Sequence, residues 1–306
     1  MSAPRLLVIV GPTAAGKSAL ALRLGERFNG IVISADSRLI YRGMDIGTAK
    51  PTAEERARVP HALIDIINPD EPFGLADYQR LAYEAIAEAH AAGRLPMLVG
   101  GTGQYVRAVV EGWNIPPAPP QPMLRQALEA EAEREGAAAL HRRLAEVDPP
   151  AAARIDPRNV RRVIRALEVY LTTGRPISEL QRRSPPGYDL LQIGLRLERE
   201  RLYQRIDARV EEMLAAGLLE EVRRLRAAGY ADDLPSMSAL GYRQLIAHLR
   251  GEISLAEAVE RIKRDTRRFV HQQMVWFRER DPAIEWFDAE DREGIEARVA
   301  GWLEDE

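Results

Sequence analysis

The sequence predicts an α/β fold, a doubly wound parallel sheet with an inserted α-helical domain. Short apolar segments with β-branched residues at 5–10, 30–35 and 95–100 are interspersed with segments of helical spacing, which is typical of a parallel sheet covered on both faces. The first apolar segment runs into a glycine-rich turn that opens a helix. Further along, WNIPPAPPQP at 113–122 precedes a stretch that carries only helical signals.

The first strand and helix enclose a phosphate-binding loop (P-loop). GPTAAGKS matches G-x-x-x-x-G-K-S between the strand RLLVIV and the amphipathic segment ALALRLGERF. In this geometry backbone N–H groups surround an anion, Lys17 adds a point charge, and Ser18 offers its hydroxyl to Mg²⁺. An ordinary strand-turn-helix junction is the alternative. The predicted diphosphate- or nucleotide-binding residues are Gly11, Pro12, Thr13, Ala14, Ala15, Gly16, Lys17 and Ser18.

The second strand, GIVISA, places Asp36 at the carboxyl end of a parallel strand. Active sites of open α/β sheets form at those strand ends. A carboxylate there can hold Mg²⁺ through water or accept a proton from a nucleophile. The alternative is that Asp36 caps the next helix. The following segment, GMDIGTAKP, indicates a substrate loop, although a surface turn has a similar composition.

A helix over 75–93, stopped by Gly93, leads to the third strand, LPMLVG, and the turn VGGTGQYVRAV. Many phosphate-loop enzymes have a metal-binding Asp at the end of this strand, and this chain has Gly-Gly-Thr-Gly. We interpret the glycines as a second anion-binding concavity in which Thr102 offers a hydroxyl. A tight strand-to-helix turn also explains the glycines. The missing acid argues against ATP hydrolysis and ordinary kinase chemistry.

The proline-rich segment, with five prolines in ten residues, marks the clearest boundary in the chain. We expect a helical insertion at 119–187 in a core formed by 1–118 and 188–306. Asp156 and Pro157 stand where an N-cap and a first helical residue belong. Beyond RRSPPGYDL the strand LLQIGLRL resumes the sheet, and long helices such as 199–217 follow it. The helices expected in the insertion cover 122–134, 137–147 and 155–174.

Charge is distributed unevenly along the 306 residues, whose formal net charge is −3. Residues 281–306 hold ten acids and two arginines, whereas 154–183 hold eight arginines and three acids. Residues 261–280 add seven basic residues against two acids. Two basic patches indicate a polyanionic partner. The alternative is that Arg is the default surface cation, because the chain has three lysines beside 40 arginines.

Composition also limits cofactors and compartment. Without cysteine the chain forms no disulfide and no thiolate zinc site, and the five histidines are far apart in sequence. Mg²⁺ held by oxygens is therefore the one metal that we expect. No apolar stretch approaches the roughly 20 residues that cross a bilayer, and the N-terminus does not resemble a signal peptide. We expect a cytoplasmic protein without membrane contact, and nothing demands more than a monomer.

Six segments carry a resemblance to a known family: GPTAAGKS, ISADSRLIYRGMDIGTAKP, LVGGTGQY, DPRNVRRVIRALEVY, SMSALGYRQ and TRRFVHQQMVWFR. Their order and approximate spacing resemble those of bacterial tRNA dimethylallyltransferases, the tRNA isopentenyltransferase family, over nearly the whole chain. Only ADSRLIYRGMDIGTAKP is distinctive alone, but the ordered set is highly specific. The resemblance implies a P-loop fold with an inserted helical domain. It also implies transfer of a dimethylallyl group from dimethylallyl diphosphate to N6 of adenosine 37, beside the anticodon.

The resemblance implies a role for individual residues. Residues 13–18 and Thr102 would hold the diphosphate with Ser18 on Mg²⁺, and Asp36 would be the general base. Three positions depart from the family pattern. Ser18 is often Thr, which is a neutral exchange, whereas His271 and Gln272 stand where Lys and Arg are commoner, which argues against a strong phosphate contact from that helix. The cysteine-containing zinc module of eukaryotic relatives is absent. The implied tRNA-contacting residues are Asp36, Ser37, Arg38, Leu39, Thr102, Arg161, Arg162, Val163, Ile164, Arg165, Ser238, Ala239, Leu240, Gly241, Tyr242 and Arg243.

The residues suit this chemistry. The exocyclic amine of adenine is a weak nucleophile, so a carboxylate such as Asp36 helps by taking its proton. Departure of diphosphate builds negative charge that the P-loop, Lys17, Mg²⁺ and Thr102 would stabilise. An arginine of RIDARVEEM could join this clamp, and we favour Arg209 over Arg205, although surface arginines are the alternative.

Recognition of RNA would require extrusion of the target base, which costs a few kcal/mol that backbone contacts must offset. Arg158, Arg161, Arg162 and Arg165 have a spacing that puts three of them near one helix face, as phosphate contacts require. Tyr242 and Arg243 could stack on or hydrogen-bond unpaired bases, or belong to a helix start packed on the core.

Two other functions remain open at this stage. A nucleotide or small-molecule kinase is supported by the P-loop alone. A P-loop RNA-binding or assembly protein would use nucleotide only to switch conformation.

Overall fold

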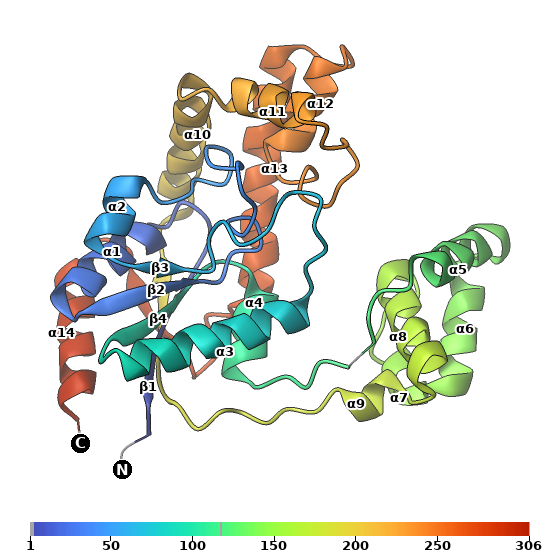
Figure 1. Ribbon diagram of the computed structural model, residues 1–306, viewed down its shortest axis with the longest axis horizontal. Helices are drawn as coiled ribbons and strands as arrows, with labels where there is room; N and C mark the ends of the chain where they lie inside the picture. Colours follow the sequence, from blue (N-terminus) through green and yellow to red (C-terminus); the bar gives the residue numbers. More distant parts are fainter. Residues whose placement is uncertain (1–2, 117, 306) are drawn as a thin grey trace. The chain divides into compact units, whose positions relative to one another are not determined.

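The computed structural model describes residues 3–116 and 118–305. The chain divides into two compact units (Figure 1). The first unit consists of Met1–Val109 and Gly187–Glu306, and the second is the insertion Val110–Pro186.

A parallel sheet of six strands forms the centre of the first unit, in the order β3-β2-β4-β1-β5-β6. The α/β fold with a parallel sheet is thus confirmed. The four strands expected from apolar runs are present, and two short ones, β3 and β6, were not predicted. The strands are β1 (Arg5–Val10), β2 (Gly30–Ser34), β3 (His61–Ala62), β4 (Leu95–Val99), β5 (Asp189–Arg196) and β6 (Glu285–Asp288).

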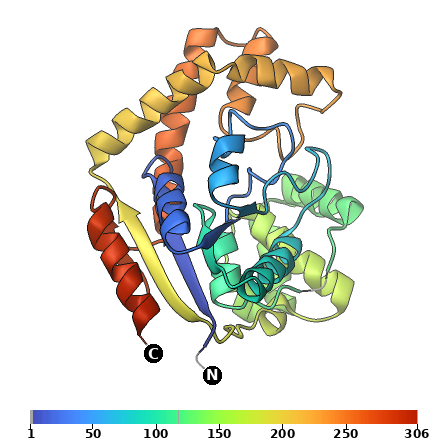
Figure 2. The ribbon, with the colours of Figure 1, turned by 60° about the vertical axis from the view of Figure 1, so that its left-hand side comes forward.

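Helices cover both faces of this sheet, as the doubly wound prediction required. Alternate residues of β1, such as Leu7 and Ile9, join a buried cluster with α1 (Lys17–Arg27) and α14 (Arg292–Glu304). The opposite face is covered by α3 (Leu75–Ala91), which contacts β2 and β4. Figure 2 shows α14 and α3 on opposite sides of the strands. The glycine-rich turn and Asp36 therefore lie at the carboxyl edge of a sheet held from both faces.

A group of helices beyond the sheet packs against the segment that follows Asp36. Ile40, Tyr41 and Met44 are buried in one cluster with residues of α10, α11, α12 and α13. No local pattern in the sequence predicts this packing. The remaining helices of the unit are α2 (Ala53–Arg58), α4 (Gly103–Val110), α10 (Arg199–Ala215), α11 (Leu218–Ala227), α12 (Tyr242–Leu249) and α13 (Leu255–Trp276).

The insertion is helical in its described residues and has its own buried core, which includes Leu128, Leu144 and Leu167. It begins at Val110, earlier than residue 119, because its entry and exit segments pair with each other. Trp113 forms an antiparallel bridge with Arg183. The helices are α5 (Pro122–Glu135), α6 (Ala137–Val147), α7 (Pro149–Ala152), α8 (Val160–Thr173) and α9 (Ile177–Leu180).

The expected start of α8 is wrong by three residues. The N-cap is Asn159, whose side chain accepts a hydrogen bond from the N–H of Arg162. Asp156 instead accepts from the N–H of Arg158 at 2.9 Å, in the turn before the helix. Both Asp156-Pro157 and Asn159 are typical of a helix start. Asp156-Pro157 forms the turn, and the helix begins after Asn159.

Among the residues that the structure describes, no helix is both long and apolar enough to cross a membrane.

Candidate active site

The P-loop joins β1 to α1 and needs glycine at two positions for different reasons. Gly11 has φ +142°, and a Cβ there would lie 2.7 Å from the carbonyl oxygen of Leu195 on β5. Gly16 has φ +100° and open space around it, so only its backbone conformation requires glycine. Gly16 is also the N-cap of α1 and provides no side chain to cap it. The first N–H groups of the helix thus remain available to an anion.

Not all the N–H groups of the loop are available, which corrects the expectation for residues 11–18. Pro12 has no N–H, and the N–H of Thr13 donates to Oε1 of Gln273 at 2.8 Å. The N–H of Ala15 donates to the carbonyl of Pro12 at 3.3 Å. In residues 3–116 and 118–305 no hydrogen bond takes the N–H groups of Ala14, Gly16, Lys17 and Ser18.

Lys17 folds back on its own loop. Its Nζ donates to the carbonyl oxygens of Gly11 at 3.0 Å and Pro12 at 2.7 Å. Burial lowers the pKa of Lys17 to about 8; the carboxylate of Asp36 opposes this shift, and the guanidinium of Arg209 adds to it. Lys17 is therefore electrostatically coupled to both residues expected at the reacting centre.

Asp36 lies two residues after the end of β2 and is half-buried. Its Oδ1 accepts a hydrogen bond from the N–H of Arg38 at 2.8 Å, whereas Oδ2 has no hydrogen-bond partner among the described residues. No α-helix begins here, since the next one, α2, starts at Ala53. Asp36 therefore caps a turn with one oxygen and keeps the other for a ligand.

Thr102 is connected to the same turn. Its N–H donates to the carbonyl of Ala35 at 3.1 Å, and its Oγ1 accepts from the N–H of Ser37 at 3.0 Å. The two partners, Ala35 and Ser37, are the residues immediately before and after Asp36 in the chain. The relative position of Thr102 and Asp36 is thus set by backbone contacts on both sides of the carboxylate.

The glycines around Thr102 serve packing, which differs from our interpretation of them as an anion-binding concavity. None of the three has a positive φ. A Cβ on Gly100 would lie 2.2 Å from the carbonyl oxygen of Ala35, and one on Gly103 would lie 2.2 Å from Cβ of Trp276. The alternative of a tight strand-to-helix turn accounts for them.

Arg209 lies closer to the site than Arg205 does. Arg205 pairs with Glu290 at 3.2 Å. Burial lowers the pKa of Arg209, and the carboxylate of Asp36 opposes that shift. The P-loop, the end of β2 and α10 thus bring Lys17, Asp36 and Arg209 together.

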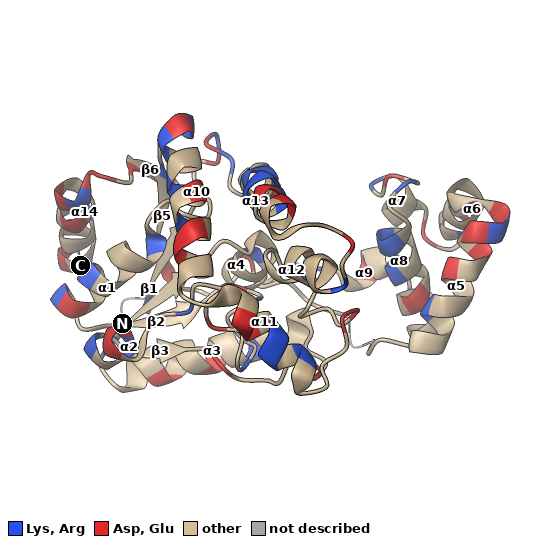
Figure 3. Ribbon diagram, turned by 90° about the horizontal axis from the view of Figure 1, so that it is seen from above, with Lys and Arg blue, Asp and Glu red and all other residues tan. Residues whose placement is uncertain are grey.

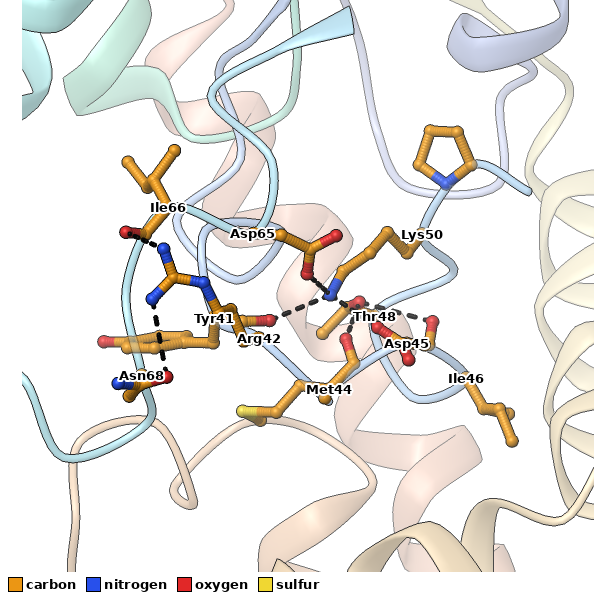
Figure 4. A network of polar contacts seen from close by, with 12 residues as sticks. Tyr41, Arg42, Met44, Asp45, Ile46, Thr48, Lys50, Asp65, Ile66 and Asn68 are labelled. Carbon is orange, nitrogen blue, oxygen red and sulfur yellow. Dashed lines mark hydrogen bonds and ion pairs between the residues drawn. The ribbon is translucent and has the colours of Figure 1, made fainter. Parts of the chain in front are cut away.

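The segment after Asp36 is held internally and is not a surface turn. Buried Lys50 donates to the carbonyl of Tyr41 at 2.8 Å and to Asp45 at 2.6 Å, and it also pairs with Asp65 (Figure 4). These bonds close the loop between residues 41 and 50 around one ammonium group.

Glu221 of α11, which is not part of this loop, also holds it in place. Its carboxylate accepts from the N–H groups of Asp45 at 2.9 Å, Ile46 at 2.8 Å and Gly47 at 3.1 Å. It also accepts from the hydroxyl of Tyr242 at 2.5 Å. One buried carboxylate therefore connects the loop, α11 and the start of α12.

Two of the expected RNA-contacting segments meet through Arg38. Its guanidinium donates to the carbonyl of Pro235 at 2.6 Å and to Oγ of Ser238 at 3.4 Å. Ser238 and Arg243 are exposed, while Ala239 is buried. Leu240 is half-buried, and Gly241 is the buried N-cap of α12.

Tyr242 does not fit the expected role of stacking on a base. Its side chain is fully buried and its hydroxyl is bonded to Glu221. A Cβ on Gly47 would lie 2.4 Å from its ring, so Gly47 packs against that ring. Tyr242 is a core residue at a helix start, which was the alternative interpretation.

Figure 3 marks basic positions along α8. Few of the side chains of the expected basic face are available to bind RNA. Val163 and Ile164 are buried in the insertion core, and Arg165 pairs with buried Glu168 at 2.6 Å. Arg161 and Arg162 are exposed, and neither has an ion pair within the described parts of the chain. Arg158 pairs with Asp156 at 2.7 Å in the preceding turn.

Other side chains that shape the site were missed by sequence reasoning. Gln273 accepts a hydrogen bond from the N–H of Thr13 in the P-loop. The hydroxyl of Tyr78 donates to the carbonyl of Ser34, two residues before Asp36, at 3.1 Å. The ring of Tyr78 stacks on Tyr105 with centroids 3.7 Å apart. The available signal was a polar residue on the apolar face of a helix, and Glu221 and Gln273 both carry it.

Oxygen donors are present for a cation but do not form a cage. The structure described for residues 3–116 and 118–305 has no group of three or more His, Cys, Asp or Glu residues that could hold a metal ion. Ser18 is exposed at the start of α1, and Oδ2 of Asp36 has no hydrogen-bond partner in the described part of the chain. This donor set fits Mg²⁺, provided that a ligand supplies further oxygens.

A protein-family model described as IPP transferase matches residues 39–280. This chain belongs to the IPP transferase family. It is 60% identical over 273 residues to the tRNA dimethylallyltransferase of Roseiflexus sp. (strain RS-1), which covers 89% of this chain and 90% of that protein. It is 51% identical over 302 residues to the tRNA dimethylallyltransferase of Dehalococcoides mccartyi, and this match covers 98% of this chain and 93% of that protein.

Solved structures of IPP transferases agree with this assignment. The structure of the full-length tRNA isopentenylpyrophosphate transferase from Bacillus halodurans has a TM-score of 0.73 and 45% identity, covering 98% of this chain and 97% of that one. The structure of a eukaryotic dimethylallyltransferase acting on tRNA has a TM-score of 0.82 and 26% identity, and the match covers 98% of this chain and 77% of that one. The likeness thus extends over the sheet and the insertion of this member of the family.

Proposed function

We propose that this chain transfers a dimethylallyl group from dimethylallyl diphosphate to N6 of adenosine 37 in tRNA and releases diphosphate. The observation that carries the proposal is the meeting of Lys17, Asp36 and Arg209 beside the P-loop, in a chain of the IPP transferase family. A cation pair next to a carboxylate suits a reaction that expels an anion and removes a proton.

The P-loop binds the diphosphate in this proposal. The free N–H groups of residues 14 and 16–18 and the N-terminus of α1 face the phosphates, and Lys17 and Arg209 add positive charge. As the allylic C–O bond breaks, its electron pair goes to the diphosphate oxygen, and these fixed donors stabilise the new charge. Ser18 would hold Mg²⁺, which would neutralise part of the diphosphate charge.

Asp36 removes the proton. The N6 amine forms the new bond to the five-carbon group, and its proton goes to Oδ2, the carboxylate oxygen with no hydrogen-bond partner among the described residues. The other oxygen keeps the carboxylate oriented through the N–H of Arg38. Thr102 is held beside this carboxylate through Ser37 and contributes its hydroxyl to the diphosphate.

The RNA partner is the anticodon stem-loop. Exposed Arg161 and Arg162 on α8 contact backbone phosphates, and Arg38, Ser238 and Arg243 contact the loop. Adenosine 37 leaves the stack to reach Asp36, and the phosphate contacts offset the cost of unstacking.

Incubation with an anticodon stem-loop RNA and dimethylallyl diphosphate labelled in its five-carbon group tests the proposal. We expect the label in the RNA. An unlabelled RNA together with transfer of the γ-phosphate from ATP to an acceptor would contradict it and support a kinase.

A further inference from the structure

Gln273 is a buried polar side chain to which the proposed reaction assigns no step. It lies near the C-terminal end of α13 and is 4% exposed. Its carboxamide bonds two backbone groups: Oε1 accepts from the N–H of Thr13 at 2.8 Å, and Nε2 donates to the carbonyl of Gly101 at 3.2 Å. Thr13 belongs to the P-loop and Gly101 to the turn that carries Thr102. One side chain therefore joins the two loops of the site.

Gln273 packs tightly against the turn that contains Gly101. A Cβ on Gly101 would lie 2.1 Å from Nε2 of Gln273, so the amide occupies the space of a side chain at position 101. Three residues further along the same helix, Trp276 occupies the corresponding space at Gly103. The turn around Thr102 is thus fitted to α13 on either side of the threonine.

We propose that Gln273 is a positioning residue for the transfer reaction. It holds the P-loop and the Gly100–Gly103 turn at one separation, so that the loop N–H groups and Thr102 act on the same diphosphate. A buried amide bonded at both ends is fixed, because rotation breaks at least one of its bonds. The inference rests on the proposed function, since the diphosphate is the group that both loops would bind.

The same bond shapes the anion site. Because the N–H of Thr13 donates to Gln273, the free N–H groups of the loop are those of residues 14 and 16–18. The donors then lie at the helix end of the loop, beside Lys17 and Ser18.

The neighbouring glutamine provides a matched control. Gln272 is exposed and has no hydrogen bond among the described residues. Gln273→Met keeps an unbranched side chain of similar length and removes both bonds, and Gln272→Met makes the same chemical change outside the contact. The readouts are KM for dimethylallyl diphosphate, kcat, the Kd of RNA, and the Kd of inorganic diphosphate from calorimetry, with thermal unfolding to show that each variant is folded.

We expect Gln273→Met to weaken diphosphate binding and to lower kcat/KM for dimethylallyl diphosphate by about 100-fold, as a misplaced group does. The Kd of RNA stays at the wild-type value, and Gln272→Met matches wild type in every readout. A folded Gln273→Met protein with wild-type diphosphate affinity and kcat/KM would overturn the inference. Diphosphate binding needs neither RNA nor a prenyl donor, so it tests Gln273 even if transfer to RNA is absent and the proposed function fails.

A double-mutant cycle tests the contact from its other side. Gly101→Ala pushes against the amide in wild type, but in Gln273→Ala the added Cβ meets no side chain there. We expect Gly101→Ala to weaken diphosphate binding strongly in wild type and little in Gln273→Ala. Equal losses in the two backgrounds would show that the two positions are independent and would contradict the proposal.

Discussion

At the scale of single residues, the site depends on which polar atoms the protein leaves unbonded. Asp36 uses Oδ1 for the N–H of Arg38 and keeps Oδ2 for a ligand. The ammonium group of Lys17 donates hydrogen bonds to two carbonyl oxygens of its own loop, and burial lowers the pKa of Lys17 to about 8. Both groups can therefore accept a new partner when a ligand binds.

Asp36→Asn keeps an oxygen for the N–H of Arg38 and removes the base. We expect kcat to fall by about 10²- to 10⁴-fold, because proton removal contributes a factor of that size. The Kd of RNA remains near the wild-type value in a filter-binding measurement. A loss of RNA binding with unchanged kcat would remove the assignment of Asp36 as the base.

Lys17 predicts a pH dependence of substrate binding. Its pKa in the free protein is lowered, so the ammonium is charged below about pH 8 and loses its charge as pH rises through that value. We expect KM for dimethylallyl diphosphate to rise between pH 7 and 9 by an amount on the order of 10-fold.

Lys17→Arg provides the control, since an arginine stays charged over this range. Its KM is expected to be higher throughout but independent of pH in the same window. An identical pH dependence in both proteins would assign the titration to another group.

At the scale of elements, α10 to α13 position the segment that carries Asp36. Glu221 on α11 bonds three successive N–H groups of the loop after Asp36 and the hydroxyl of Tyr242 on α12. Gln273 on α13 bonds the P-loop. Helices α11 and α13 thus reach two different loops of the site, each through one buried polar side chain.

Glu221→Gln replaces an acceptor of four hydrogen bonds by an amide with one oxygen. We expect the free energy of unfolding to fall by about 2 kcal/mol, since hydrogen bonds to charged groups contribute on that order. Urea denaturation measures it. Glu220→Gln changes an exposed neighbour that pairs with Arg223 and should stay within about 0.5 kcal/mol of wild type. Equal effects of the two variants would show that the loop does not depend on Glu221.

The sequence predicts these elements unevenly, for physical reasons. Apolar runs locate β1, β2, β4 and β5, but β6 reads EWFD, in which two of four residues are charged. Local patterns also identify the P-loop and Asp36. The bond between Gln273 and Thr13 spans 260 residues, and no local pattern encodes such a contact. For the glycines at 100–103 the sequence indicates close approach, but only the fold shows that the approaching groups belong to the protein.

At the scale of the whole molecule, we expect the core to bind the prenyl donor and the insertion to bind the RNA backbone. The boundary at Val110 makes the insertion a separate compact unit with its own buried residues. Arg161 and Arg162 lie on its surface, so their replacement should leave the catalytic core intact.

Replacing Arg161 and Arg162 together by Gln should weaken RNA binding in all sequences alike. Each lost phosphate contact lowers the slope of log K against log salt by about 1. The KM for dimethylallyl diphosphate stays unchanged. Arg143→Gln is the matched control in the same unit, because Arg143 pairs with Glu131 at 2.6 Å. An unchanged salt slope in the double variant would show that this face does not contact phosphate.

In the proposed reaction a prenyl group moves to N6 of one adenosine, and the P-loop holds the diphosphate as it leaves. Mass spectrometry of nucleosides from a stem-loop RNA treated with the protein and dimethylallyl diphosphate tests it most directly. We expect N6-dimethylallyladenosine at position 37, one diphosphate released for each modified base, and no product when a purine without the exocyclic amine stands there. A modified RNA that lacks this nucleoside, or diphosphate release with no RNA modification, would contradict it.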